Sequence, residues 1–207
     1  MSQYIIFEGI VGTGKTTQSK KLYEYIKKNN PGMKVILTRE PGGTEIAEAI
    51  RKIVQGSEFN EVMQAECEAY LYAASRAQSL RTVVKPILDK NGIVISDRSY
   101  LSSVAYQGAA RSLGAKTVLE INKIAVNGIL PSKIIYLDLS PETGLKRCFD
   151  KKGDKFEKED IEFFNNVKLG YIELSKLPEL KNKWSTIDAT GSVEQVFQRI
   201  IQTLHSF

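Results

Sequence analysis

The segment Gly9–Thr16 constrains this 207-residue chain more than any other stretch, since it fits the pattern G-x-x-x-x-G-K-[ST] of the phosphate-binding P-loop. A short β-prone run, Tyr4–Phe7, leads into it, and residues 14–29 follow with apolar side chains on one helical face. This order of strand, glycine loop and helix directs backbone N–H groups and a helix N-terminus at an anion. We therefore predict a P-loop that binds the phosphates of a nucleotide.

The P-loop pattern also assigns roles to individual side chains. Lys15 is expected to reach the outer phosphates, and the Thr16 hydroxyl is expected to ligate Mg²⁺. The nucleotide-binding set predicted for this loop is Gly9, Ile10, Val11, Gly12, Thr13, Gly14, Lys15, Thr16 and Thr17.

Short apolar runs alternate with helical stretches along the whole chain. The predicted strands are 4–7, 35–38, 93–96, 134–138 and 184–187, and the predicted helices are 14–29, 45–56, 61–90, 100–112, 116–128, 141–150, 158–177 and 192–205. This alternation predicts an α/β chain of the P-loop NTPase fold, with a five-stranded parallel sheet and helices on both faces. Ligands of such sheets bind at the carboxyl ends of the strands.

Composition narrows the class of function. With 42% hydrophobic and 26% charged residues, the chain has the make-up of a soluble globular protein, and its net charge of +5 suits anionic ligands. No basic block with interleaved aromatic residues stands out, so nucleic-acid binding is not expected. Two cysteines and one histidine are too few for a Cys/His zinc site, and Cys67 and Cys148 are expected to be buried thiols. We expect no signal peptide, no membrane span and a cytoplasmic location.

Two further strand ends carry side chains suited to phosphate chemistry. The run Ile93–Ser96 is followed by Asp97, which can support the Mg²⁺ held by the P-loop hydroxyl, and by Arg98, whose planar fork fits a phosphate. An ordinary ion pair at a strand end is the alternative. The loop Thr38–Thr44 offers Arg39 as a clamp for a second phosphate, although such a loop also fits a simple turn.

Two other segments have both a functional and an ordinary interpretation. Tyr72 and Arg76 lie four residues apart, so on a helix they share one face and can stack on a base and bond to its edge. The alternative is an amphipathic core helix with a surface arginine. Residues 146–160 are rich in both charges, which suits either a solvated loop or a mobile lid over phosphates.

Taken together, these features resemble the thymidylate (dTMP) kinases over nearly the full length of the chain. The matching motifs are Phe7–Gly9 into the P-loop, Thr38–Thr44, Asp97-Arg98, Ala105–Gly108, Tyr136–Asp138, Gly144–Arg147 and Ile187–Thr190. The resemblance implies one nucleoside monophosphate kinase domain over residues 1–207, an enzyme of nucleotide biosynthesis. It implies transfer of a phosphoryl group from ATP to dTMP with Mg²⁺, and a homodimer.

The resemblance also implies a place for each acceptor-binding side chain. Arg39 and Arg98 would hold the acceptor monophosphate, Tyr72 would stack on the base, and Arg76 would contact the base edge. Tyr106 would crowd the sugar 2′ position and favour deoxyribose. The complete implied acceptor set is Arg39, Tyr72, Arg76, Arg98, Ser103, Tyr106 and Gln107.

On the donor side, the resemblance places Arg147 against the adenine of ATP and a lid at about residues 148–158. Lys155 stands where the family has a lid arginine, and it keeps the charge without the bidentate fork. The implied catalytic residues are Lys15, Asp97, Arg98 and Lys155, with Thr16 and Asp97 at the Mg²⁺.

Besides the lid lysine, two positions depart from the family pattern and keep alternatives open. Val11 stands where the family commonly has an acid, and Ser99 stands where it has an aromatic residue or histidine. The alternatives are a kinase of the same fold for another nucleotide or nucleoside, and a catalytically weak nucleotide-binding paralogue. A GTPase-type switch would need Asn-Lys-x-Asp, and the nearest match, Asn122–Ala125, lacks the aspartate.

Overall fold

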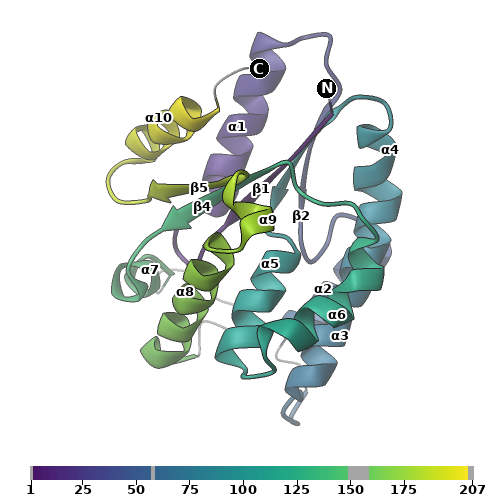
Figure 1. The fold of residues 1–207 in the computed structure, drawn as a ribbon, viewed down its shortest axis with the longest axis vertical. Coiled ribbons are helices and arrows are strands. Elements are labelled where there is room, and N and C mark those ends of the chain that lie inside the picture. Colours follow the sequence, from purple (N-terminus) through teal and green to yellow (C-terminus); the bar gives the residue numbers. More distant parts are fainter. Residues whose placement is uncertain (1, 57–58, 149–158, 205–207) are drawn as a thin grey trace.

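One five-stranded parallel sheet forms the centre of the molecule (Figure 1), in a computed structural model that describes residues 2–56, 59–148 and 159–204. The strands are β1 (Gln3–Glu8), β2 (Val35–Arg39), β3 (Ile93–Asp97), β4 (Lys133–Asp138) and β5 (Trp184–Asp188), in the order β2-β3-β1-β4-β5. The predicted strands and the predicted α/β fold class are confirmed. Each observed strand extends the predicted one by a single residue at one or both ends.

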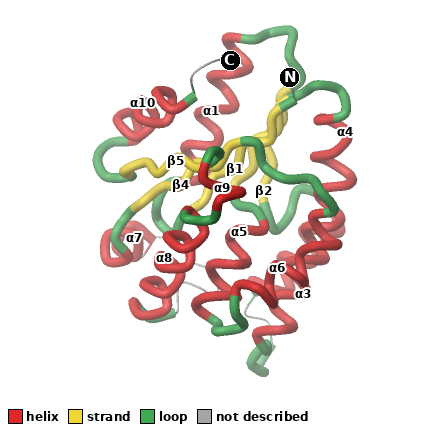
Figure 2. Tube along the Cα trace, viewed as in Figure 1, coloured by secondary structure: helices red, strands yellow, loops and turns green. Residues whose placement is uncertain are grey.

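Helices cover both faces of the sheet (Figure 2). They are α1 (Lys15–Asn29), α2 (Glu45–Gln55), α3 (Ala65–Ser79), α4 (Lys85–Leu88), α5 (Tyr100–Ser103), α6 (Ala115–Val126), α7 (Pro141–Cys148), α8 (Ile161–Ser175), α9 (Pro178–Lys181) and α10 (Val193–Thr203), with π-helical segments η1 (Leu80–Val84) and η2 (Val104–Ala110). The helix predicted at 61–90 begins later, at Ala65, and continues through η1 into α4. The predicted lid at 148–158, with Lys155, lies outside the described residues apart from Cys148 at the end of α7.

The core consists of two apolar layers, one on each face of the sheet. Ile5 and Phe7 of β1 pack in the layer under α1 and α10, whereas Tyr4 and Ile6 pack in the layer under α3, η2 and α8. This split follows from the strand, because successive side chains point to opposite faces. Each fully buried Ile or Phe side chain contributes about 1.5–3 kcal/mol, so both layers hold β1 firmly.

The strand order places the P-loop at the switch point of the sheet. After β1 the chain crosses first to β2 on one side, and the later strands β4 and β5 lie on the other side. β1 lies between β3 and β4. Phe7 near its end is opposite Asp97 at the end of β3, and Glu8 is opposite Tyr136, two residues before the end of β4. β2 brings Arg39 opposite Asp97 on the far side of β3. Because ligands of open parallel sheets bind at such a switch point, the fold gathers the predicted side chains there.

Two further sequence-based expectations concern single features. Among the described residues, no helix is both long enough and apolar enough to cross a bilayer. Cys67, expected to be a buried thiol, is exposed on α3, because the inward face of this helix is formed by residues such as Ala69, Tyr72 and Ala73.

Candidate active site

The P-loop is in direct backbone contact with α7. Gly12 has a φ of 73°, and a Cβ at this position would lie 2.0 Å from the Gly144 carbonyl oxygen. Conversely, a Cβ on Gly144 would lie 2.6 Å from the Val11 carbonyl oxygen. Only two glycines permit this approach, which carries Arg147 to the rim of the loop. Its guanidinium donates to the carbonyls of Gly12 at 3.5 Å and Ala189 at 3.2 Å.

Lys15 lies inside the loop rather than at its surface. Its side chain is only 6% exposed, and Nζ donates to the Ile10 carbonyl and, at 3.2 Å, to Thr13 Oγ1. The ammonium group therefore sits at the N-terminus of α1, where the helix dipole and the loop N–H groups also favour an anion.

Thr16 and Asp97 meet beside the loop. Thr16 Oγ1 donates to Asp97 Oδ2 at 2.5 Å, which joins the start of α1 to the end of β3. Two hard oxygen ligands suit Mg²⁺, which usually takes one or two protein oxygens and fills its other positions with phosphate and water. Among the described residues, no three acidic, histidine or cysteine side chains gather into a metal site of their own.

An open cleft runs along the P-loop. It brings together predicted residues from four segments of the chain: Val11, Gly12, Gly14, Lys15, Thr16, Thr17, Arg39, Asp97, Arg98 and Arg147. Arg39 is exposed and bound by Glu48 through two hydrogen bonds, of 3.2 and 2.8 Å, so it lies at the rim.

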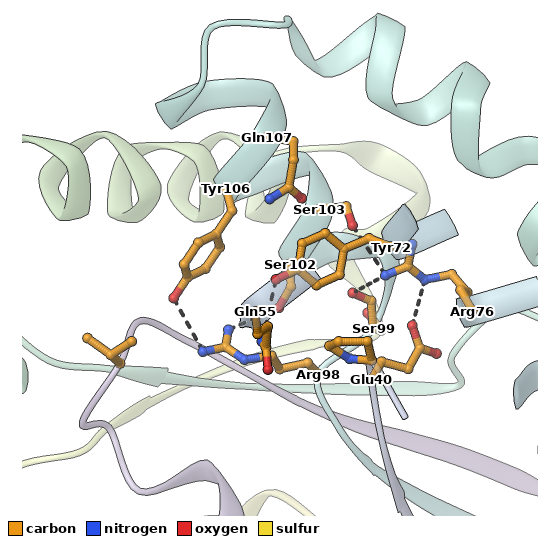
Figure 3. Close-up of a pocket in the computed structure, with 12 residues that line it drawn as sticks. Glu40, Gln55, Tyr72, Arg76, Arg98, Ser99, Ser102, Ser103, Tyr106 and Gln107 are labelled. Carbon is orange, nitrogen blue, oxygen red and sulfur yellow. Dashed lines mark hydrogen bonds and ion pairs between the residues drawn. The ribbon is translucent and has the colours of Figure 1, made fainter. Parts of the chain in front are cut away.

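A second, narrower cavity adjoins this cleft (Figure 3). It contains every predicted acceptor-binding side chain except Arg39: Tyr72, Arg76, Arg98, Ser103, Tyr106 and Gln107. The two cavities share Val11, Glu40, Gln55 and Arg98. One elongated site thus runs from the P-loop to the narrower pocket.

Comparison with known proteins agrees with this geometry. The thymidylate kinase family model matches residues 7–200. The chain belongs to the thymidylate kinase family. A thymidylate kinase of Finegoldia magna is 45% identical over 202 residues, which cover 97% of each chain. One of Caldanaerobacter subterraneus subsp. tengcongensis is 39% identical over 99% of this chain and 96% of its own. The crystal structure of thymidylate kinase from Ehrlichia chaffeensis superposes with a TM-score of 0.81 at 27% identity, covering 99% of both chains.

Arg76, the arginine that the thymidylate kinase resemblance places at the base edge, is buried rather than at the surface. It is 2% exposed and forms an ion pair of 2.6 Å from Nε to Glu40 Oε2 (Figure 3). Its NH1 group donates to Asn122 Oδ1, and NH2 donates to the Ser99 carbonyl and Ser103 Oγ, both at 3.2 Å. The surface alternative for Arg76 is therefore wrong, and these four bonds leave at most one N–H of its five for a ligand.

Arg98 turns towards the junction of the two cavities. Its backbone has a φ of 74°, and its guanidinium donates to the Gly9 carbonyl at 3.2 Å, Ser102 Oγ at 3.2 Å and Tyr106 OH at 3.3 Å. The guanidinium carbon also lies 5.0 Å from the Tyr106 ring centroid. Since Asp97 instead bonds to Thr16, an ion pair between Asp97 and Arg98 does not describe this strand end.

The aromatic and amide side chains of the pocket are fixed by their neighbours. Tyr72 is 8% exposed, and its hydroxyl accepts a hydrogen bond of 3.4 Å from Gln55 Nε2. Gln107 Nε2 donates to Glu68 Oε1 at 2.6 Å. This bond uses the amide nitrogen of Gln107 and not its carbonyl oxygen.

Sequence reasoning missed several residues that line the site. Arg51 and Gln55 lie four apart on α2, and Arg51 donates to the Pro41 carbonyl at 2.9 Å. Their spacing on the helix that follows the Arg39 loop is a signal that was available. Glu40, Ser99 and Ser102 also line the pocket, but only their long-range contacts show it.

Proposed function

We propose that this protein transfers the γ-phosphoryl group of ATP to the phosphate of dTMP, giving ADP and dTDP. The observation that carries the proposal is the shared boundary of the two cavities, where Arg98 lines both the P-loop cleft and the narrower pocket. Such a boundary suits a reaction between two phosphate-bearing substrates bound end to end. Membership of the thymidylate kinase family supports the same assignment.

On the donor side, the P-loop would surround the ATP phosphates and Arg147 would lie beside the adenine. Thr16 and Asp97 would hold Mg²⁺, which when bound neutralises charge on the phosphates. Lys15 would leave its contacts within the loop and bind the outer phosphates.

On the acceptor side, the pocket offers one partner for each part of dTMP. Arg98 and Arg39 would hold the phosphate, while Tyr106 would lie near the sugar 2′ position. Tyr72 would stack on thymine and Arg76 would donate to a carbonyl on its edge. Ser103 and Gln107 complete the set around the base.

The chemistry requires positioning and charge neutralisation more than acid–base catalysis. The attacking acceptor oxygen already belongs to an anionic phosphate near neutral pH, so no strong base is needed. Lys15 and Arg98 would stabilise the charge of the transferred group. The catalytic role of Lys155 stays a prediction, since this lysine lies outside the described residues.

We expect dTMP and dUMP to be better acceptors than dCMP or purine nucleoside monophosphates. Arg76 offers only N–H donors, which pair with the base carbonyl of thymine or uracil but oppose the amino group of cytosine. The difference in kcat/KM between dTMP and dCMP should be at least about tenfold. A coupled ADP-release assay across all nucleoside monophosphates measures it. Equal values for dTMP and dCMP would favour another acceptor.

We expect Asp97→Asn to raise the Mg²⁺ concentration that gives half-maximal activity by about 10-fold or more. The substitution keeps the shape of the side chain and its oxygen near Thr16 Oγ1, but removes the charge that attracts the cation. A Mg²⁺ titration at saturating ATP and dTMP measures the effect, with Asp89→Asn, on an exposed turn of the chain, as the control. An unchanged Mg²⁺ requirement would remove Asp97 from the proposed metal site.

We also propose a homodimer formed through the layer of α2, α3 and α6. α3 packs against both other helices, and all three carry exposed apolar or aromatic side chains. These are Ile46, Ile53, Tyr70, Leu119 and Ile124. Sedimentation equilibrium should give twice the chain mass, and Ile53→Glu should lower it towards one chain mass. A monomeric wild type would contradict this proposal.

A further inference from the structure

Glu8 closes β1 immediately before the P-loop, and the proposed reaction leaves it without a role. Its side chain is fully buried and accepts hydrogen bonds from three hydroxyl groups. Ser99 Oγ donates to Oε1 at 2.6 Å, while Ser102 Oγ and Tyr171 OH donate to Oε2 at 2.6 and 2.8 Å. Three donors on one carboxylate satisfy it well beyond the minimum that burial requires.

Ser102 connects this carboxylate to Arg98. The Arg98 NH1 group donates to Ser102 Oγ at 3.2 Å, and both side chains lie at the pocket wall (Figure 3). A hydroxyl has one proton, and the short bond of 2.6 Å to Glu8 takes it. The lone pairs of Ser102 therefore face the guanidinium. A charged Glu8 makes Ser102 an acceptor for Arg98.

We propose that Glu8 is a positioning residue for the acceptor phosphate, because through Ser102 it holds the Arg98 guanidinium at the boundary of the two cavities. The inference rests on the proposed function, in which Arg98 binds that phosphate. A long side chain that is already fixed loses less rotamer freedom when its ligand arrives, so preorganisation appears as tighter phosphate binding.

The charges around Glu8 agree with this arrangement. Burial raises the pKa of the Glu8 carboxyl, and the Ser102 and Ser99 hydroxyls and the Arg98 charge offset only part of that rise. The hydrogen bonds and Arg98 thus act against burial and in favour of the carboxylate form, which is the form that orients the Ser102 proton.

The chain offers a matched pair of variants to test the inference. Ser102→Ala and Tyr171→Phe each remove one hydroxyl from the same Glu8 oxygen. The two hydroxyls also lie 2.9 Å apart, but only Ser102 accepts a hydrogen bond from Arg98. Calorimetric titration of the full chain with dTMP and with thymidine gives two Kd values. The Kd of thymidine divided by the Kd of dTMP measures how much the phosphate contributes to binding. We expect Ser102→Ala to lower this ratio about tenfold with the thymidine Kd unchanged, as for loss of one charge-assisted hydrogen bond.

Tyr171→Phe should leave the ratio within about twofold. Glu8→Gln should lower it as Ser102→Ala does, because an amide N–H can turn the Ser102 proton towards Arg98. In an Arg98→Ala background, Ser102→Ala should have no further effect on the ratio, as expected of residues that act through one contact.

Equal effects of Ser102→Ala and Tyr171→Phe on the ratio would overturn the inference, since the network would then only support the fold. Parallel weakening of thymidine and dTMP would do the same. If the wild type turns over dTMP and Ser102→Ala keeps the full ratio, only the role of Glu8 fails. If the wild type binds thymidine as tightly as dTMP, both the acceptor assignment and the role of Glu8 fail.

Discussion

Replacing Lys15 with alanine is expected to lower kcat by at least about 10²-fold while the protein stays folded. The ammonium lies at the N-terminus of α1 within the P-loop, where it is close to the expected position of the transferred phosphoryl group. Charge develops on that group in the transition state, so losing the cation raises the barrier by several kcal/mol. Its contacts to the Ile10 carbonyl and Thr13 hydroxyl are worth only about 0.5–1.5 kcal/mol each.

Steady-state kinetics with ATP and dTMP, together with a thermal melt, separate the two effects. Lys27→Ala is the matched control, since Lys27 is an exposed lysine near the other end of the same helix. A Lys15→Ala enzyme with kcat within a few-fold of the wild type would remove Lys15 from the proposed mechanism.

Replacing Glu40 with alanine is expected to lower the free energy of unfolding by about 3–5 kcal/mol and to abolish discrimination between acceptor bases. Glu40 and Arg76 are 3% and 2% exposed and approach to 2.6 Å, so removing the carboxylate leaves a buried, uncompensated guanidinium. Tyr4 OH also donates to Glu40 Oε1, at 3.2 Å, and loses this acceptor. An Arg76 without its partner no longer presents a fixed donor to the base.

Urea unfolding of Glu40→Ala can be compared with Asp89→Ala, which breaks the Lys85–Asp89 pair. That pair has the same separation of 2.6 Å, but its side chains are 56% and 57% exposed. It should therefore contribute less than about 1 kcal/mol. Losses of similar size in the two variants would show that burial of the Glu40–Arg76 pair has little energetic consequence.

A second comparison separates stability from recognition. Replacing Glu40 and Arg76 together with Leu and Met should recover much of the lost stability, because a buried ion pair can be exchanged for apolar packing. The same double variant should not recover the preference for dTMP over dCMP. Recovery of both would mean that the base is recognised elsewhere in the pocket.

Sequence alone predicted the sheet and the P-loop because their signals are local. Apolar runs such as 93–96 mark buried strands wherever they occur, and the glycine loop carries its own spacing. The burial of Arg76 could not be predicted in this way, since Glu40 and Asn122 are distant along the chain and meet it only in the folded pocket. The same holds for Glu8, which in the sequence is one acid at a strand end and in the structure is surrounded by three hydroxyls.

The resemblance to a family predicted acceptor-binding roles for residues whose spacing alone did not indicate such a role. Tyr72 and Arg76 alone fitted an ordinary core helix better than a binding site, and only the surrounding motifs favoured a binding role. The structure then brought both side chains to one cavity with Ser103, Tyr106 and Gln107, although nothing in the sequence places these residues at a common distance.

The glycine contact between the P-loop and α7 has a consequence for how this site can vary. Gly12 and Gly144 touch backbone to backbone, so no flexible side chain between them can absorb a displacement. A displacement of α7 therefore displaces the phosphate-binding loop by a similar amount, and it also moves Arg147, which lies on the same helix. If one glycine is replaced by a larger residue, no substitution at the other glycine can restore the space, because glycine is already the smallest residue. Both positions therefore require glycine. An insertion near α7 should first lower the affinity for the nucleotide.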